Sequence, residues 1–152
     1  MKPQTIADLA AVVDHSLLHP TLTDDELRAG CAYARHVGAA SVSIKPYAVK
    51  MAAEVLAGSS TAVGAVVGFP HGNSRIAVKI HEAQVAIGDG ATELDAVVNV
   101  GKVLGGDWDF VEMEVEALNA LAVANSALLK LIFENDFLPE DSYKIKLCEI
   151  CS

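Results

Sequence analysis

Short apolar runs and amphipathic segments alternate along the whole chain. The runs are predicted to be strands, and they lie at 10–14, 40–44, 62–70, 92–101 and 127–133. Between them, apolar residues recur every three or four positions, which is typical of helices packed on one side. Five β/α units in succession predict a parallel sheet joined by right-handed crossovers.

Helix start signals support this division. Thr23 and Glu26 form a capping-box pattern at the head of the first long helical segment. Asn73 and Asp107 are predicted to cap the next two helices. The last helix is expected to start around Pro139, because proline is favoured in the first turn. No low-complexity linker interrupts the chain, so a single domain is expected.

Strand alternation places the polar residues of each run on one face, opposite an all-apolar face. The residues with reactive or charged groups on these polar faces are Asp14, Ser43, Glu93, Asp95 and Lys130. In an open sheet with helices on both sides, these polar side chains would not meet in one place. In a (β/α)₈ barrel they meet in the interior. The pattern therefore favours the first five β/α units of a TIM barrel.

A dinucleotide-binding sheet is the main alternative fold. Such a sheet usually has G-x-G-x-x-G after its first strand. Here the first run continues into "HSLLHP", and the chain has no P-loop motif. The nucleotide-binding alternative is therefore disfavoured.

Composition and charge narrow the partners. The chain is 52% hydrophobic and 20% charged, which suits a sheet covered by helices on its apolar side. A net charge of -9 disfavours nucleic acid and anionic membranes as partners. The N-terminus has no apolar signal-peptide core, and no apolar run is long enough to span a membrane. A cytoplasmic protein is expected.

The cysteines and histidines predict no metal site and no cofactor. Cys148 and Cys151 form a C-x-x-C pair, but the pair falls late in a predicted helix. Redox pairs occupy helix N-termini, and zinc would need two further ligands. Two half-buried structural thiols are expected instead. The five histidines show no ligand spacing.

Inward lysines and carboxylates together suit carbonyl chemistry. An unprotonated lysine attacks a carbonyl to form a Schiff base, and a carboxylate moves the protons. Glycosidases also use carboxylate pairs, but their chemistry does not call for inward lysines. Spacing alone leaves aldolase-type chemistry as one possibility among several.

Five ordered motifs make the case more specific. The chain resembles the deoxyribose-phosphate aldolases, which are class I aldolases on a TIM barrel, and the likeness covers essentially all of residues 1–152. The motifs are "VVDHSLLHP" (12–20), "ASVSIKPYAV" (40–49), "VGFPHGNS" (67–74), "ELDAVVNVG" (93–101) and "LLKLIFEND" (128–136). The resemblance implies cleavage of 2-deoxyribose 5-phosphate to acetaldehyde and glyceraldehyde 3-phosphate, in deoxyribonucleotide catabolism.

The resemblance also assigns roles. Asp95 matches the family's proton donor and acceptor, while Asp14 and Lys130 match polar residues that line the same site. Ser43, often cysteine in the family, is expected to line the site. A purely structural pairing of Asp95 with Lys130 remains an alternative, and Lys130 as the nucleophile is disfavoured. The expected partners are a small phosphorylated sugar and, as a possibility, further copies of the chain.

Two features of the family are missing from the sequence. The Schiff-base lysine of the family lies on strand six in a Lys-Thr-Ser-Thr-Gly motif, and the chain holds no such motif. Phosphate sites in these barrels come from the loops after strands seven and eight. The expectation is a truncated aldolase that is inactive alone. The alternative is a non-catalytic partial barrel that acts through self-association or partner binding.

Overall fold

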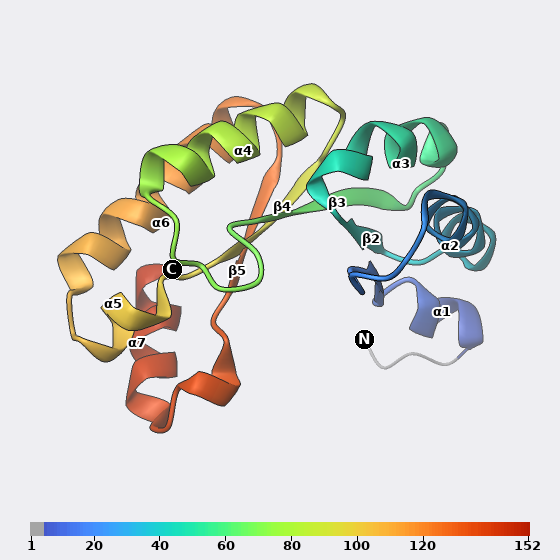
Figure 1. The fold of residues 1–152 in the computed structure, drawn as a ribbon. Helices are drawn as coiled ribbons and strands as arrows, with labels where there is room; N and C mark the ends of the chain where they lie inside the picture. Colours follow the sequence, from blue (N-terminus) through green and yellow to red (C-terminus); the bar gives the residue numbers. More distant parts are fainter. Residues whose placement is uncertain (1–4) are drawn as a thin grey trace.

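The strands lie in chain order in one parallel sheet. The computed structural model describes residues 5–152, and in them the sheet order is β1-β2-β3-β4-β5 (Figure 1). The strands are β1 (Asp14–Leu17), β2 (Ser41–Ile44), β3 (Ala62–Val67), β4 (Glu93–Val97) and β5 (Leu128–Ile132). Sequential parallel pairing is the arrangement of consecutive β/α units in a barrel, which confirms the predicted fold class.

Helices cover one side of this sheet. α2 packs against α3, and α4 packs against α6, so neighbouring crossovers share a layer (Figure 1). The helices are α1 (Ile6–Ala10), α2 (Asp24–Val37), α3 (Val49–Leu56), α4 (Ile76–Gly88), α5 (Val100–Leu104), α6 (Trp108–Ala124) and α7 (Asp141–Ile150), with short 3₁₀ turns η1 (Pro46–Ala48) and η2 (Asn135–Phe137). Within the described part of the chain, none of these helices has the length and apolarity needed to cross a membrane.

Two predicted caps are confirmed. The Thr23 hydroxyl accepts a hydrogen bond from the Glu26 amide, and the Glu26 carboxylate accepts one from the Thr23 amide. Gly38 ends α2 in the left-handed conformation, at φ 71°. The Asp107 carboxylate accepts a hydrogen bond from the Phe110 amide at the start of α6. Local sequence therefore sets these helix ends.

The predicted first strand at 10–14 is wrong. A capping box between Thr5 and Asp8 starts α1 instead, and β1 begins only at Asp14. Val12, read as part of that strand, is 70% exposed. The apolar run belongs to a short helix and a turn, because the capping box favours a helix locally.

Other boundaries also differ from the prediction, and the third strand, expected at 62–70, ends at Val67. Asn73 does not cap α4, whose N-cap residue is Arg75. The reason is a tight turn, closed by the hydrogen bond from the Gly72 amide to the Gly68 carbonyl, which delays the helix. The fourth strand ends at Val97 rather than near 101, because Asn99 caps α5 with its side chain.

The register fixes which polar residues are level with one another. Asp14 pairs with Ser41, and Asp95 pairs with Lys130. Gly64 on β3 is level with both Ser43 on β2 and Glu93 on β4. Because side chains alternate along each strand, these positions face the side of the sheet away from the helices. The candidate residues are thus gathered on one face by strand pairing alone.

Candidate active site

Lys130 lies at the centre of a cluster of three carboxylates from two strands, β1 and β4. Its Nζ atom is 2.9 Å from Asp14 Oδ2, 2.7 Å from Glu93 Oε2 and 3.2 Å from Asp95 Oδ1. Asp14 and Lys130 are 116 residues apart in the chain, on the first and last strands of the sheet. Their contact requires a sheet curved enough for its two edge strands to face each other across a concave side.

The surroundings of Lys130 hold it in the charged form. Partial burial works to lower its pKa, but hydrogen bonds to Glu93 and Asp14, with the charges of Asp95 and Glu93, outweigh that effect. The net result is a pKa raised above the ordinary range of lysine. An amine that stays protonated at neutral pH is not a nucleophile. Lys130 is therefore suited to neutralise the carboxylates rather than to attack a carbonyl.

Asp95 is the most buried carboxylate of the cluster, with 7% of the residue exposed. Its Oδ2 atom accepts a hydrogen bond of 2.7 Å from the Ser43 hydroxyl, while Oδ1 faces Lys130. The Ser43 bond reaches from β2 to β4, over the intervening strand. Both carboxylate oxygens thus have fixed partners, one neutral and one charged, which holds the side chain in a single orientation.

Gly64 makes room for the bond between Ser43 and Asp95. A Cβ atom on Gly64 would lie 3.4 Å from Asp95 Oδ2 and 3.2 Å from the carbonyl oxygen of Val42. The distance to the Val42 oxygen is tighter than ordinary van der Waals contact, and the distance to Asp95 is at its lower limit. A branched side chain here would occupy the space that the Ser43–Asp95 bond crosses.

Asp14 is held ionised by its neighbours. The Ser41 hydroxyl donates a hydrogen bond of 2.7 Å to Asp14 Oδ1, and Lys130 donates to Oδ2. These two hydrogen bonds, the Ser41 bond first, lower the pKa of Asp14 despite the opposing effect of its partial burial. Asp14 is therefore an anion at neutral pH, and it shares the Lys130 ammonium with Glu93 and Asp95.

The four residues singled out from the sequence thus meet in one cluster. Asp14 and Asp95 both contact Lys130, and Ser43 contacts Asp95. Strand alternation also placed Glu93 on this face, but did not indicate its close contact with Lys130. The catalytic and substrate-lining roles assigned to these residues stay predictions.

The sequence did not reveal a buried ion pair outside the cluster. Lys79 of α4 lies 2.7 Å from Glu114 of α6, and both side chains are 0% exposed. Apolar periodicity predicted a helix face through Ile76, Ile80, Ala83 and Ile87, and it assigned no role to Lys79. The signal that was available is that Lys79 falls on that apolar side, between Ile76 and Ile80.

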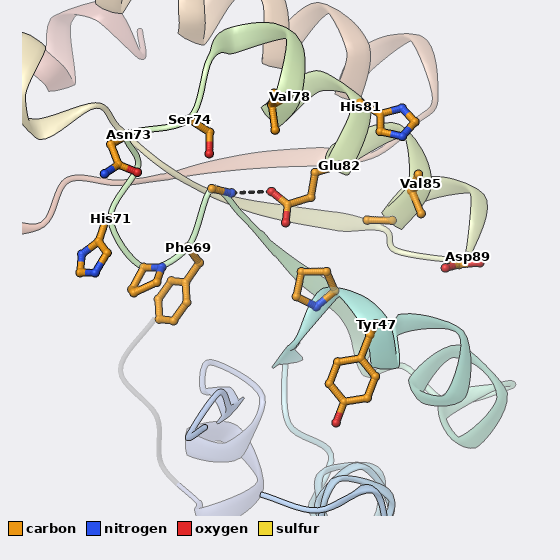
Figure 2. Close-up of a pocket in the computed structure, with 14 residues that line it drawn as sticks. Tyr47, Phe69, His71, Asn73, Ser74, Val78, His81, Glu82, Val85 and Asp89 are labelled. Carbon is orange, nitrogen blue, oxygen red and sulfur yellow. Dashed lines mark hydrogen bonds between the residues drawn. The ribbon is translucent and has the colours of Figure 1, made fainter. Parts of the chain in front are cut away.

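Two cavities lie near the carboxyl-terminal ends of β2 and β3. One, of about 440 Å³, is lined by Leu22, Lys45, Val66 and Phe69 among others. The other, of about 480 Å³, is bounded by Tyr47, by the turn at 68–74 and by α4 (Figure 2). The two share Tyr47 and Phe69. Both are mainly apolar, and none of Asp14, Ser43, Asp95 or Lys130 lines either of them.

The remaining candidates add no metal centre. Residues 5–152 hold no group of three histidine, cysteine or carboxylate side chains placed to bind a metal ion. Cys148 and Cys151 are both exposed, so their expected half-burial is wrong. They stand at the last turn and C-cap of α7.

The amino-acid sequence is similar to those of curated proteins. No protein-family model matches the chain. A curated protein named deoxyribose-phosphate aldolase from Rhodopirellula baltica is 46% identical over 145 residues. The match covers 95% of this chain and 60% of that protein. The chain thus spans about 60% of the length of this curated relative.

Solved structures agree with the sequence match. A crystal structure from Coccidioides immitis, described as a putative deoxyribose-phosphate aldolase, superposes with a TM-score of 0.92 at 29% identity. The match covers 100% of this chain and 59% of that one. A deoxyribose phosphate aldolase from Aeropyrum pernix, described as a unique tetramer, gives a TM-score of 0.87 at 29% identity. That match covers 96% of this chain and 60% of the Aeropyrum chain.

The described residues form a partial TIM barrel with five parallel strands, the fold of the deoxyribose-phosphate aldolase structures that they resemble. The sequence is homologous to the deoxyribose-phosphate aldolases and corresponds to the N-terminal part of their chain.

Replacing Gly64 by valine should destabilise the protein by crowding the Ser43–Asp95 hydrogen bond. The added branches meet Val42 and Asp95, and such overpacking typically costs about 1–3 kcal/mol of unfolding free energy. Urea unfolding followed by circular dichroism measures this. Gly88→Ala is the matched control, because a Cβ on Gly88 meets no heavy atom within 4 Å. The control should gain up to about 1 kcal/mol, since alanine favours a helix. Equal effects of the two substitutions would contradict the role of Gly64.

The Asp14→Asn variant should lose stability only where Asp14 is ionised. Because the folded pKa of Asp14 is lowered, its contribution is present above the unfolded pKa, about 3.9, and is lost as pH falls through the folded pKa. Wild type should therefore be more stable than Asp14→Asn at pH 6, and the gap should shrink steadily below about pH 4. Urea midpoints at a series of pH values test this. A gap that persists unchanged to pH 2 would contradict it.

Proposed function

We propose that this chain supplies the acid–base half of a class I aldolase that cleaves 2-deoxyribose 5-phosphate to acetaldehyde and glyceraldehyde 3-phosphate. The observation that carries the proposal is the Asp95 carboxylate, buried and fixed between the Ser43 hydroxyl and the Lys130 ammonium. The homology to deoxyribose-phosphate aldolases supports the reaction and the substrate.

In this proposal Asp95 moves protons. A class I aldolase must protonate and deprotonate the groups around a Schiff base, directly or through water. Asp95 reaches into the concave side from the central region of the sheet, and its two fixed contacts hold the carboxylate ready for that transfer. Lys130 provides the positive charge beside it, and Asp14 and Glu93 hold Lys130 in place.

The nucleophilic amine lies outside the described cluster. The raised pKa of Lys130 keeps its amine protonated, so it is a poor Schiff-base former. The family resemblance assigns that step to a lysine on strand six. Residues 1–152 would then form one domain that works as part of a longer barrel in the cytoplasm, and act alone only as an incomplete site.

The second candidate function is association without catalysis. Its support is the pair of open sheet edges, β1 and β5, beside which Val13 is 45% and Leu128 55% exposed. Unpaired parallel edges carry free backbone donors and acceptors and favour pairing with another chain. Copies of this chain, or a polypeptide that supplies further β/α units, would cover them.

A chimera tests the aldolase proposal. Residues 1–152 are continued with the part of the Rhodopirellula baltica aldolase that lies beyond the matched region. We expect cleavage of deoxyribose 5-phosphate, and a loss of about 10² to 10⁴ in kcat for Asp95→Asn while circular dichroism shows the variant still folded. The matched control is Glu112→Gln, an exposed carboxylate on α6. An Asp95→Asn chimera within a few-fold of the parent would leave Asp95 a structural role only.

The 152-residue chain alone should form no adduct. It is incubated with deoxyribose 5-phosphate, reduced with borohydride and weighed by intact-mass spectrometry. We expect an unmodified mass, because Lys130 stays protonated. The chimera is the positive control, and its adduct should map beyond Ser152. A stoichiometric adduct on Lys130 with turnover above blank would overturn this assignment.

A further inference from the structure

A buried ion pair lies on the helix side of the sheet, although apolar packing there would avoid the free-energy cost of removing two charges from water. Lys79 and Glu114 are both fully shielded, with 2.7 Å between Nζ and Oε1. Removing two charges from water is expensive, and apolar residues of similar volume are often as stable or more stable. What a charged pair adds is a defined arrangement of the groups around it.

Those groups are the backbone at the end of β4. Lys79 Nζ donates a hydrogen bond of 2.7 Å to the carbonyl oxygen of Val97, the last residue of the strand. Glu114 Oε2 accepts one of 3.2 Å from the amide of Asn99, which caps α5. The pair therefore holds both backbone groups at the point where β4 leaves the sheet.

The same helix also holds the end of β3. Glu82, one turn after Lys79 on α4, accepts a hydrogen bond of 2.7 Å from the Gly68 amide (Figure 2). The Lys79 side chain packs under Gly68, where a Cβ atom would come within 2.8 Å of its Cε. α4 thus fixes the ends of two neighbouring strands from the side opposite the cluster.

We infer that Lys79 and Glu114 are positioning residues for Asp95, an inference that rests on the proposed function. Asp95 lies two residues before Val97 on the same strand. Its carboxylate must meet Ser43 at 2.7 Å and Lys130 at 3.2 Å together, so a small shift of β4 breaks one contact. A misplacement of about 1 Å in a catalytic group can cost about 10²-fold in rate.

Paired substitutions separate positioning from stability. Lys79→Met with Glu114→Leu keeps the apolar volume and removes every polar contact of the pair. Lys79→Gln with Glu114→Gln keeps groups able to hydrogen-bond to each other and to Val97 and Asn99. The matched control is Lys146→Met with Glu112→Gln, an exposed ion pair that also joins α6 to a neighbouring helix.

Kinetics in the chimera and amide exchange in the 152-residue chain are the readouts. In the Met/Leu variant we expect kcat to fall roughly 10- to 100-fold, with KM within about twofold and Tm little changed. The Gln/Gln variant should recover most of that loss, and the surface control should match the parent. Exchange of the Asn99 amide should quicken in the Met/Leu variant, because its acceptor is gone.

Each outcome decides the inference. A Met/Leu chimera with the kcat of the parent overturns it. If the Met/Leu variant does not fold, Lys79→Met with Glu114→Gln replaces it, since this variant removes the hydrogen bond to Val97, and an unchanged kcat there overturns the inference. If the parent chimera is inactive, the proposed function fails and the ¹³C shift of the Asp95 carboxyl in the 152-residue chain decides. A shift that moves on Met/Leu substitution supports positioning, and an unmoved shift overturns it.

Discussion

The ammonium of Lys130 is the interaction on which the concave side of the sheet depends. The three carboxylates from β1 and β4 would repel one another in a partly dehydrated space, and one cation within 3.2 Å of all three removes that conflict. The contact also joins the first strand to the fifth, so the curvature of the sheet and its charge balance are one constraint. Without the ammonium, the hydrogen bond between Lys130 and Asp14 that joins the two edge strands would be lost.

The cluster depends equally on a missing side chain. β3 contributes Gly64 at the level of Ser43 and Glu93, and the Ser43–Asp95 bond crosses above it. On the other side of β4, a fully buried Lys79–Glu114 ion pair occupies a position where apolar residues would ordinarily pack. β4 is thus held by polar contacts on both faces. Its acids lie on the concave side, while its core-facing residues Leu94 and Ala96 are fully buried.

Sequence alone predicted the parts that follow from local rules. Strand alternation sorted Asp14, Ser43, Asp95 and Lys130 onto one face because the period of two holds in every strand. It failed at 10–14, where a capping box at Thr5 outweighed an apolar run. It also missed the Lys79–Glu114 pair, because apolar periodicity assigns a charge to solvent. Only packing of α4 on α6 reveals that these two charges, 35 residues apart, bury each other.

The cluster also bears on the proposed function, because it makes Lys130 unsuited to the role of nucleophile beside Asp95. A lysine becomes nucleophilic when burial or a neighbouring cation lowers its pKa, whereas carboxylates within hydrogen-bonding distance raise it. Lys130 has three such carboxylates, so the environment that keeps Asp95 in place is the one that disables Lys130 as an attacking amine. In the proposed function, a Schiff-base amine would therefore have to stand farther from Asp14 and Glu93 than Lys130 does.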